Sequence, residues 1–195
     1  MRTIAIFNLK GGVGKTITTA TMAYCLATRH RKRVLVIDGD SQGNLSQYFR
    51  VKALEGESLV DLLEGSCEPY WGDFVTETLH HRIRIIPSDG RMMDADVTSV
   101  AQGRCNPRAI EELREAIAED NGMDYILIDC APAFNASGVA ALRAADDVII
   151  PVRLDTFATE GALGLMRQID NMHRANDRLR VAGLLITQWR NTELE

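Results

Sequence analysis

The stretch that decides the fold is Ile4-Ala5-Ile6-Phe7-Asn8-Leu9-Lys10-Gly11-Gly12-Val13-Gly14-Lys15-Thr16. An apolar run with strand character ends at Asn8, a glycine-rich turn follows, and a helical pattern begins near Lys15. In such a layout the glycines let successive backbone N–H groups point inward, and the helix start adds partial positive charge. The order of strand, glycine loop and helix therefore predicts a phosphate-binding loop rather than a surface turn with incidental lysines.

Two lysines in this loop indicate a nucleotide as the ligand. The chain has only four lysines, and two of them, Lys10 and Lys15, lie here. An ammonium group is a compact point charge that suits phosphate oxygens. We expect Lys15 to reach the outer phosphates and the Thr16 hydroxyl to ligate Mg²⁺. The spacing differs from the common pattern G-x-x-x-x-G-K-[ST], because Leu9 stands where the first glycine would fall.

Length and composition predict one globular domain over residues 1–195. The chain is 46% hydrophobic and 25% charged, which is ordinary for a soluble protein. No apolar run approaches the length of a membrane span, and the first residues lack the layout of a signal peptide. The net charge of −5 argues against a dedicated nucleic-acid binder that works by bulk charge, although a local patch stays open.

The cysteines and histidines do not form a metal or disulfide pattern. Cys25, Cys67, Cys105 and Cys130 lie far apart without a C-x-x-C pair, so we interpret them as reduced thiols of a cytoplasmic protein. The pair at 80–81 (His-His) has no partner at ligand spacing, which predicts surface or turn residues.

Continuous apolar runs alternate with helical patterns along the chain. Runs of this kind suit strands that are buried on both faces, as in a parallel sheet. The predicted helices are Lys15–Thr28, Pro107–Asn121 with Asn106 as N-cap and Gly122 as the stop, and Thr159–Ala175 with Leu163, Met166, Ile169 and Met172 or close neighbours on one face. The predicted strands are Ile4–Phe7, Val34–Ile37, Ile83–Ile86, Tyr125–Ile128, Val148–Val152 and Val181–Thr187. The alternation predicts a doubly wound α/β domain, a mostly parallel sheet flanked by helices, with its ligand at the carboxyl ends of the strands.

Three carboxylates fall where this geometry places the ligand. Asp38 and Asp40 follow the strand Val34–Ile37, and Asp129 follows the strand Tyr125–Ile128. A carboxylate at the end of a buried strand beside a phosphate loop can hold Mg²⁺ directly or through its waters. A second carboxylate two residues after Asp38 can orient or activate an attacking water. Each Asp alone is weak evidence because Asp commonly ends strands. Their joint placement, however, predicts a metal site at the edge of the sheet where these strands end, which we call the metal edge.

The loop Lys-Gly-Gly-Val-Gly-Lys-Thr resembles the deviant phosphate loop of the ParA/MinD/Soj group of partition and positioning ATPases. The segment Asp38-x-Asp40-x-Gln42-Gly43-Asn44 resembles the first switch of that family, with Ser41 where a proline is usual. The resemblance implies a P-loop NTPase of the SIMIBI-like class that binds ATP and Mg²⁺. It also implies an ATP-dependent homodimer, because the family's first loop lysine, matched by Lys10, reaches the partner subunit's nucleotide.

Residue by residue, the resemblance implies the following roles. Asp38 matches a carboxylate of the magnesium shell, Asp40 the catalytic carboxylate, and Asp129 the carboxylate of the second magnesium motif. Ala131 departs from the usual Cys-Pro-Pro continuation of that motif. The loop set that holds the nucleotide is Lys10, Gly11, Gly12, Val13, Gly14, Lys15, Thr16 and Ile17, the last at a position where threonine is common. Lys10 and Lys15 would offset charge that develops on the transferred phosphoryl group.

Other segments bear on partners. Ala140–Pro151 and Phe157–Gly161 also resemble family segments, the latter near the dimer face. Gln188 is our candidate for the adenine pocket, and Arg190 for a DNA contact. The basic run Arg29–Arg33 is better interpreted as solvated cations at a helix C-terminus than as a DNA site. Family members continue with a further helix-rich segment, so we expect either a short variant or a missing C-terminal segment.

The function that these features imply is a slow, partner-stimulated ATPase acting as a dimerisation switch. Its expected context is plasmid or chromosome partitioning with a ParB-like partner and nonspecific DNA, in the cytoplasm and without a membrane partner. The alternatives are a MinD-like positioning ATPase, which would need a basic amphipathic C-terminal helix, and a non-hydrolysing nucleotide-dependent regulatory module. A nitrogenase-reductase-like protein would need cluster-bridging cysteines, and a dethiobiotin-synthetase-like ligase should lack Lys10.

Overall fold

The computed structural model describes residues 1–65, 71–95, 105–120, 122–154 and 158–188, with backbone alone for 158–160. Within these residues one seven-stranded sheet has the order β3-β4-β2-β5-β1-β6-β7. Every neighbouring pair is parallel except β3–β4. The strands are β1 (Arg2–Ile6), β2 (Val34–Gly39), β3 (Thr76–Glu77), β4 (Ile83–Ile86), β5 (Tyr125–Cys130), β6 (Asp147–Arg153) and β7 (Arg180–Thr187). The predicted doubly wound α/β class is confirmed.

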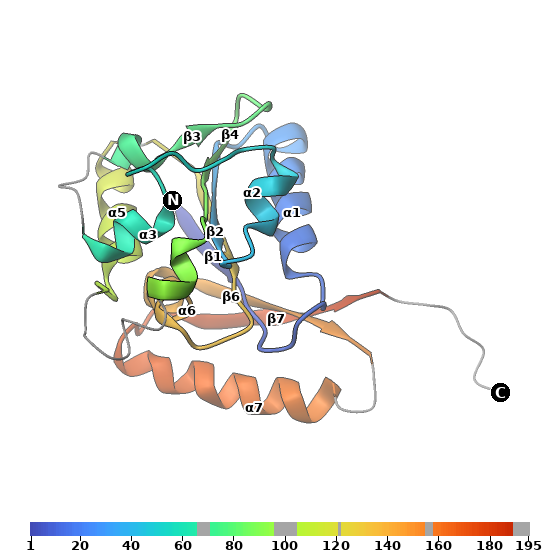
Figure 1. Ribbon diagram of the computed structural model, residues 1–195. Coiled ribbons are helices and arrows are strands. Elements are labelled where there is room, and N and C mark those ends of the chain that lie inside the picture. The colour runs from blue at the N-terminus through green and yellow to red at the C-terminus, as the bar shows by residue number, and fades with distance from the viewer. Residues whose placement is uncertain (66–70, 96–104, 121, 155–157, 189–195) are drawn as a thin grey trace.

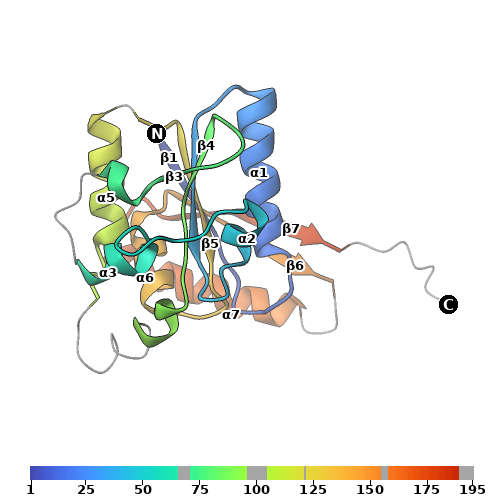
Figure 2. The same ribbon diagram turned by 45° about the horizontal axis from the view of Figure 1, so that its top comes forward.

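Helices cover the two faces of the sheet unequally (Figure 1). One face carries α1 (Lys15–Arg29) and the short α2 (Asn44–Tyr48), whose Ala20, Ala23 and Leu45 pack on β1, β2 and β4. The other face carries α3 (Leu59–Glu64), α5 (Ala109–Glu119), α6 (Ala136–Ala144) and α7 (Ala158–Asn171). The turned view in Figure 2 keeps α1 and α5 on opposite sides of the strands. Two 3-10 turns, η1 (Trp71–Phe74) and η2 (Met172–Arg174), and a helical stretch at residues 91–95 also lie among the described residues.

The central strands are buried on both faces, as their unbroken apolar runs predict. All six residues of β2 are buried, and in β5 only Tyr125 is partly exposed. Burying both faces of these strands removes their apolar side chains from water, and such burial is the main stabilising term of a fold of this kind.

Helix α5 begins later than predicted. The sequence pattern placed its start at Pro107 with Asn106 as N-cap, whereas the helix spans Ala109–Glu119. The Asn106 side chain instead accepts a hydrogen bond from the Arg108 backbone N–H at 2.9 Å, in a turn that precedes the helix. Gly122 does end the segment, because its N–H donates to the Ile117 carbonyl at 3.2 Å. An asparagine therefore initiates the turn rather than capping the helix itself.

The last two elements also differ from expectation. Of the predicted helix face, Ile169 is buried and Met166 and Met172 pack partly buried against the core, whereas Leu163 is 54% exposed and its neighbours Ala162 and Leu165 are buried instead. Strand β7 lies at the sheet edge and is exposed along most of its length, so the prediction of a strand buried on both faces is wrong there. No helix among the described residues has the length and apolar character needed to cross a membrane.

Candidate functional site

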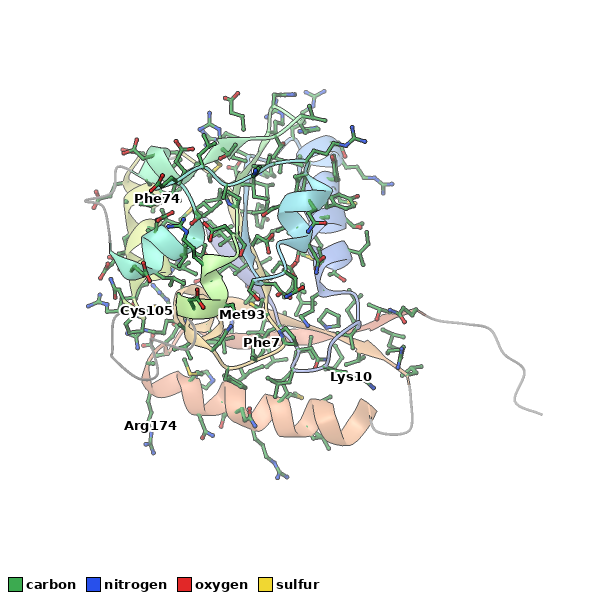
Figure 3. The ribbon with its side chains drawn as sticks, in the orientation of Figure 1. Phe7, Lys10, Phe74, Met93, Cys105 and Arg174 are labelled. Carbon is green, nitrogen blue, oxygen red and sulfur yellow. The ribbon has the colours of Figure 1, made fainter. Side chains whose placement is uncertain are left out.

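The loop between β1 and α1 forms a fixed turn at the carboxyl end of β1. Gly12 and Gly14 have φ of 69° and 88°, in the left-handed region where glycine is favoured, and Gly14 stands directly before the first residue of α1. The Asn8 side chain ties the loop to β6 by donating to the Pro151 carbonyl at 2.7 Å. Figure 3 labels Phe7 just after β1 and Lys10 further along this loop. The predicted phosphate loop therefore contains two glycines in the left-handed conformation, which allows its backbone to curl as a phosphate-binding loop requires.

Lys15 closes the loop from inside. Its side chain lies at the start of α1, is only 8% exposed, and its Nζ donates to the Lys10 carbonyl at 3.1 Å. Burial lowers the pKa of Lys15, and the nearby carboxylate of Asp129 partly offsets that effect. A buried ammonium with a single backbone acceptor retains two further donors, which fits a ligand that brings negatively charged oxygens.

Asp129 is a buried carboxylate that the protein does not satisfy. It ends β5 and is fully buried, and both of its oxygens lack a hydrogen-bond partner among the described residues. The pKa of Asp129 is raised to about 7, chiefly by burial and also by the neighbouring charge of Asp38, while the Thr16 hydroxyl and Lys15 act in the opposite direction. Such an unsatisfied pair of oxygens beside a threonine hydroxyl fits the oxygen ligands and waters that Mg²⁺ prefers.

Asp38 lies next to Asp129 and has a different environment. The two residues are register partners in the parallel pair β2–β5. The Oδ2 atom of Asp38 accepts hydrogen bonds from the backbone N–H and the hydroxyl of Ser46 at 2.8 and 2.7 Å. Burial raises the pKa of Asp38, while the hydrogen bonds from Ser46 act against that rise. Gly39 allows the two strands to approach, since a Cβ there would lie 2.8 Å from the Asp129 carbonyl oxygen.

The predicted catalytic carboxylate, Asp40, lies just beyond the end of β2 and is half-buried. Its Oδ1 accepts from the Gln42 backbone N–H at 3.0 Å, which forms a turn in the segment that resembles the first switch. Its charge acts on both Lys15 and Asp129, so the structure brings it to the same site.

Two residues at and just after the end of β7 donate hydrogen bonds to the phosphate loop. The Gln188 amide donates to the Gly12 carbonyl at 2.7 Å, and the Thr187 hydroxyl donates to the Val13 carbonyl at 2.7 Å. Gln188 therefore lies at the predicted site, although the contact is with the loop and an adenine pocket stays a prediction. Ile17 is 52% exposed on the outer side of α1.

Some predictions have a plain structural outcome. His80 and His81 lie in the turn before β4 with their rings stacked 5.1 Å apart, as expected for turn residues. Cys25 and Cys130 are free thiols, and the Cys105 thiol donates to the Ala95 carbonyl at 3.8 Å. The described part of the chain holds no group of three or more His, Cys, Asp or Glu that could bind a metal. Cys67, Phe157 and Arg190 lie outside the described residues, as does the segment after 188.

Sequence reasoning missed three residues that shape the site. Ser46 binds Asp38, Thr187 binds the loop, and Asn8 connects the loop to β6. Asn8 directly precedes the glycine loop and could have been found as a local turn former. Ser46 and Thr187 contact partners 8 and 174 positions away, for which the sequence pattern carries no signal.

The chain is similar in sequence to known proteins. Residues 1–181 match the AAA_31 family model, described as an AAA domain. The chain is 35% identical over 191 residues to the chromosome partitioning protein ParA of Caulobacter vibrioides, covering 97% of this chain and 70% of that protein. It is 36% identical over 193 residues to the chromosome-partitioning ATPase Soj of Thermus thermophilus, with coverage of 97% and 70%.

A solved structure extends the comparison to three dimensions. The cobyrinic acid a,c-diamide synthase of Mycobacterium smegmatis, with bound ADP and magnesium, superimposes with a TM-score of 0.82 at 30% identity. The match covers 98% of this chain and 76% of that protein. That protein therefore shares the fold and, in its own crystal, holds a magnesium nucleotide.

Proposed function

The chain belongs to the AAA_31 family and to the ParA/Soj family of partition ATPases, and from that premise we propose that it binds MgATP and hydrolyses it as a dimerisation switch. The observation that carries the proposal is a pair of incompletely satisfied buried charges at one sheet edge. Lys15 has one backbone acceptor, and Asp129 has two oxygens without a hydrogen-bond partner among the described residues. Burying such groups costs free energy unless a ligand completes them.

The loop residues take the phosphates. The backbone N–H groups of Gly11, Gly12, Val13 and Gly14 cradle them, and the N-terminal end of α1 adds its partial positive charge. Lys15 donates to the outer phosphates in addition to the Lys10 carbonyl. Because its ammonium is already positioned by the loop and α1, little reorganisation is needed when charge develops on the transferred group.

The metal edge is formed by three oxygen donors. Thr16 offers its hydroxyl to Mg²⁺, while Asp129 and Asp38 hold the waters of its hydration shell. When bound there, Mg²⁺ would neutralise phosphate charge, which is the general role of this ion in phosphoryl transfer. Asp40, half-buried beside this edge, orients the attacking water. Lys10 acts across a dimer on the nucleotide of the second subunit.

The biological setting of the proposal is DNA partition. The relatives that support it are named chromosome partitioning proteins, and the chain shares at least 35% identity with two of them. We place slow turnover, stimulation by a ParB-like partner, and binding of nonspecific DNA by the ATP-bound dimer in this proposal. ATP favours the dimer and hydrolysis dissolves it, which makes the nucleotide a timer for assembly.

The proposal is tested by measuring ATP turnover together with oligomeric state. We expect the wild-type protein to dimerise in light scattering only with MgATP and to return to monomers as phosphate is released. Asp40→Ala should lower turnover at least tenfold and leave a persistent ATP dimer, because the water is no longer oriented. Asp73→Ala, at an exposed acid in η1, is the control and should behave as wild type. Turnover at the wild-type rate in Asp40→Ala would show that this residue has no such role.

A further inference from the structure

The two oxygens of the Asp38 carboxylate differ in their contacts. Oδ2 accepts two hydrogen bonds from one residue, the Ser46 backbone N–H at 2.8 Å and the Ser46 hydroxyl at 2.7 Å. Oδ1 accepts from the Asp40 backbone N–H at 3.3 Å, beyond the usual range for such bonds. One oxygen is therefore firmly bound within the protein, while the other keeps accepting capacity.

Ser46 is itself held from both sides. It lies in α2 with a relative exposure of 4%, and its Oγ accepts a hydrogen bond from the Ser88 backbone N–H at 3.1 Å. The Ser88 N–H thus fixes the position of the Oγ, and the single hydroxyl proton is directed at Asp38. This contact connects the end of β2 with the segment that follows β4, 42 positions further along the chain.

We propose that Ser46 is a positioning residue that fixes the Asp38 carboxylate so that Oδ2 is bound by the protein and Oδ1 accepts from the magnesium hydration shell. The inference rests on the proposed MgATP function and adds a residue that the sequence did not indicate. Asp38 stands beside Asp129 in the β2–β5 register, so an oxygen of Asp38 and the unsatisfied oxygens of Asp129 share one edge. Residues that orient the ligands of a metal in this way commonly change metal affinity 10- to 100-fold when removed.

The structure offers a matched control for a purely structural role of Ser46. Ser137, at the start of α6, is also buried, with a relative exposure of 2%, and its hydroxyl donates to the Gly39 carbonyl at 2.8 Å. Ser137 therefore lies at the same end of β2 as Asp38. Its change to alanine removes a buried hydrogen bond comparable to the one that Ser46→Ala removes. It has no hydrogen bond to either Asp38 or Asp129 among the described contacts.

The experiment measures binding rather than turnover, with a fluorescent ADP analogue titrated at increasing Mg²⁺. We expect Ser46→Ala to raise the half-saturating Mg²⁺ concentration about tenfold. Ser46→Thr, which keeps the hydroxyl, should stay within about twofold of wild type, and Ser137→Ala should leave the Mg²⁺ dependence unchanged. Thermal unfolding of all three variants reports any loss of stability separately.

Two results would overturn the inference. One is an unchanged Mg²⁺ dependence in Ser46→Ala, and the other is an equal change in Ser46→Ala and Ser137→Ala. If Ser46→Ala does not fold, Ser46→Cys replaces it, because a thiol is a much weaker donor. A wild-type protein whose nucleotide binding ignores Mg²⁺ would overturn the proposed function itself, and that outcome is visible before any variant is compared.

Discussion

The ends of β2 and β5 carry two buried carboxylates that are register partners but are treated differently by the protein. Asp38 receives two hydrogen bonds from Ser46, whereas Asp129 receives none from the described residues. Burial raises the pKa of both groups, and at Asp129 to about 7. The fold therefore stabilises one charge internally and leaves the other to be stabilised by a ligand, which is the pattern expected where binding is coupled to stability.

The largest effect is expected when the charge at Asp129 is removed. An acid whose pKa is raised on folding binds more protons in the folded state, so stability falls as pH rises from the unfolded pKa toward about 7. At pH 8 the raised pKa of Asp129 makes the free energy of unfolding as much as about 4 kcal/mol lower than it would be with an ordinary aspartate pKa. Without Mg²⁺, Asp129→Asn should therefore be more stable than wild type at pH 8 and show little of this pH dependence.

Urea unfolding at pH 5 and pH 8 in the presence of a chelator measures this effect. Asp73→Asn, at an exposed acid, is the control and should follow the wild-type pH dependence. Equal stability of Asp129→Asn and wild type at pH 8 would mean that the protein already satisfies the charge.

A smaller effect is expected from the cation beside Asp129. Lys15→Ala removes the donor to the phosphates and should weaken ATP binding about a hundredfold, equivalent to about 3 kcal/mol. Lys32→Ala, an exposed lysine beyond the other end of α1, should bind ATP as wild type does. Calorimetric titration with ATP gives both values, and equal affinities for the two variants would remove Lys15 from the site.

The smallest effect is expected at Asp38. An asparagine there can still accept from Ser46 through its amide oxygen, so Asp38→Asn should change the unfolding free energy by only about 1 kcal/mol. Urea unfolding beside Asp129→Asn at pH 8 makes the comparison direct. If Asp38→Asn were stabilised as strongly as Asp129→Asn, the two strand ends would not differ in the way proposed.

The parts that the sequence predicted well are those with local signals. The glycine loop, the place of Lys15 at the start of α1 and the carboxylates at the ends of β2 and β5 follow from motif spacing and from apolar runs that end in Asp. Parallel strands bring their carboxyl ends to one edge, so placing the runs in order was enough to bring these groups together.

The parts that it predicted poorly depend on what packs against an element. The apolar run of β7 has the composition of a buried strand, yet Leu184 and Ile186 are 51% and 52% exposed at the sheet edge. Composition reports how apolar a strand is and not which neighbours cover it. Leu163 of α7 was misplaced for the same reason, and Ser46 was missed because its role depends on the turn between β2 and α2.

The central claim is that a bound magnesium nucleotide stabilises the buried carboxylate of Asp129. The most direct test compares the effect of Mg²⁺ on ATP affinity in wild type and in Asp129→Asn. Calorimetric titrations with and without Mg²⁺ give this effect for each protein. The account predicts at least a tenfold gain in affinity from Mg²⁺ in wild type and almost none in the variant. The same gain in both proteins would contradict it.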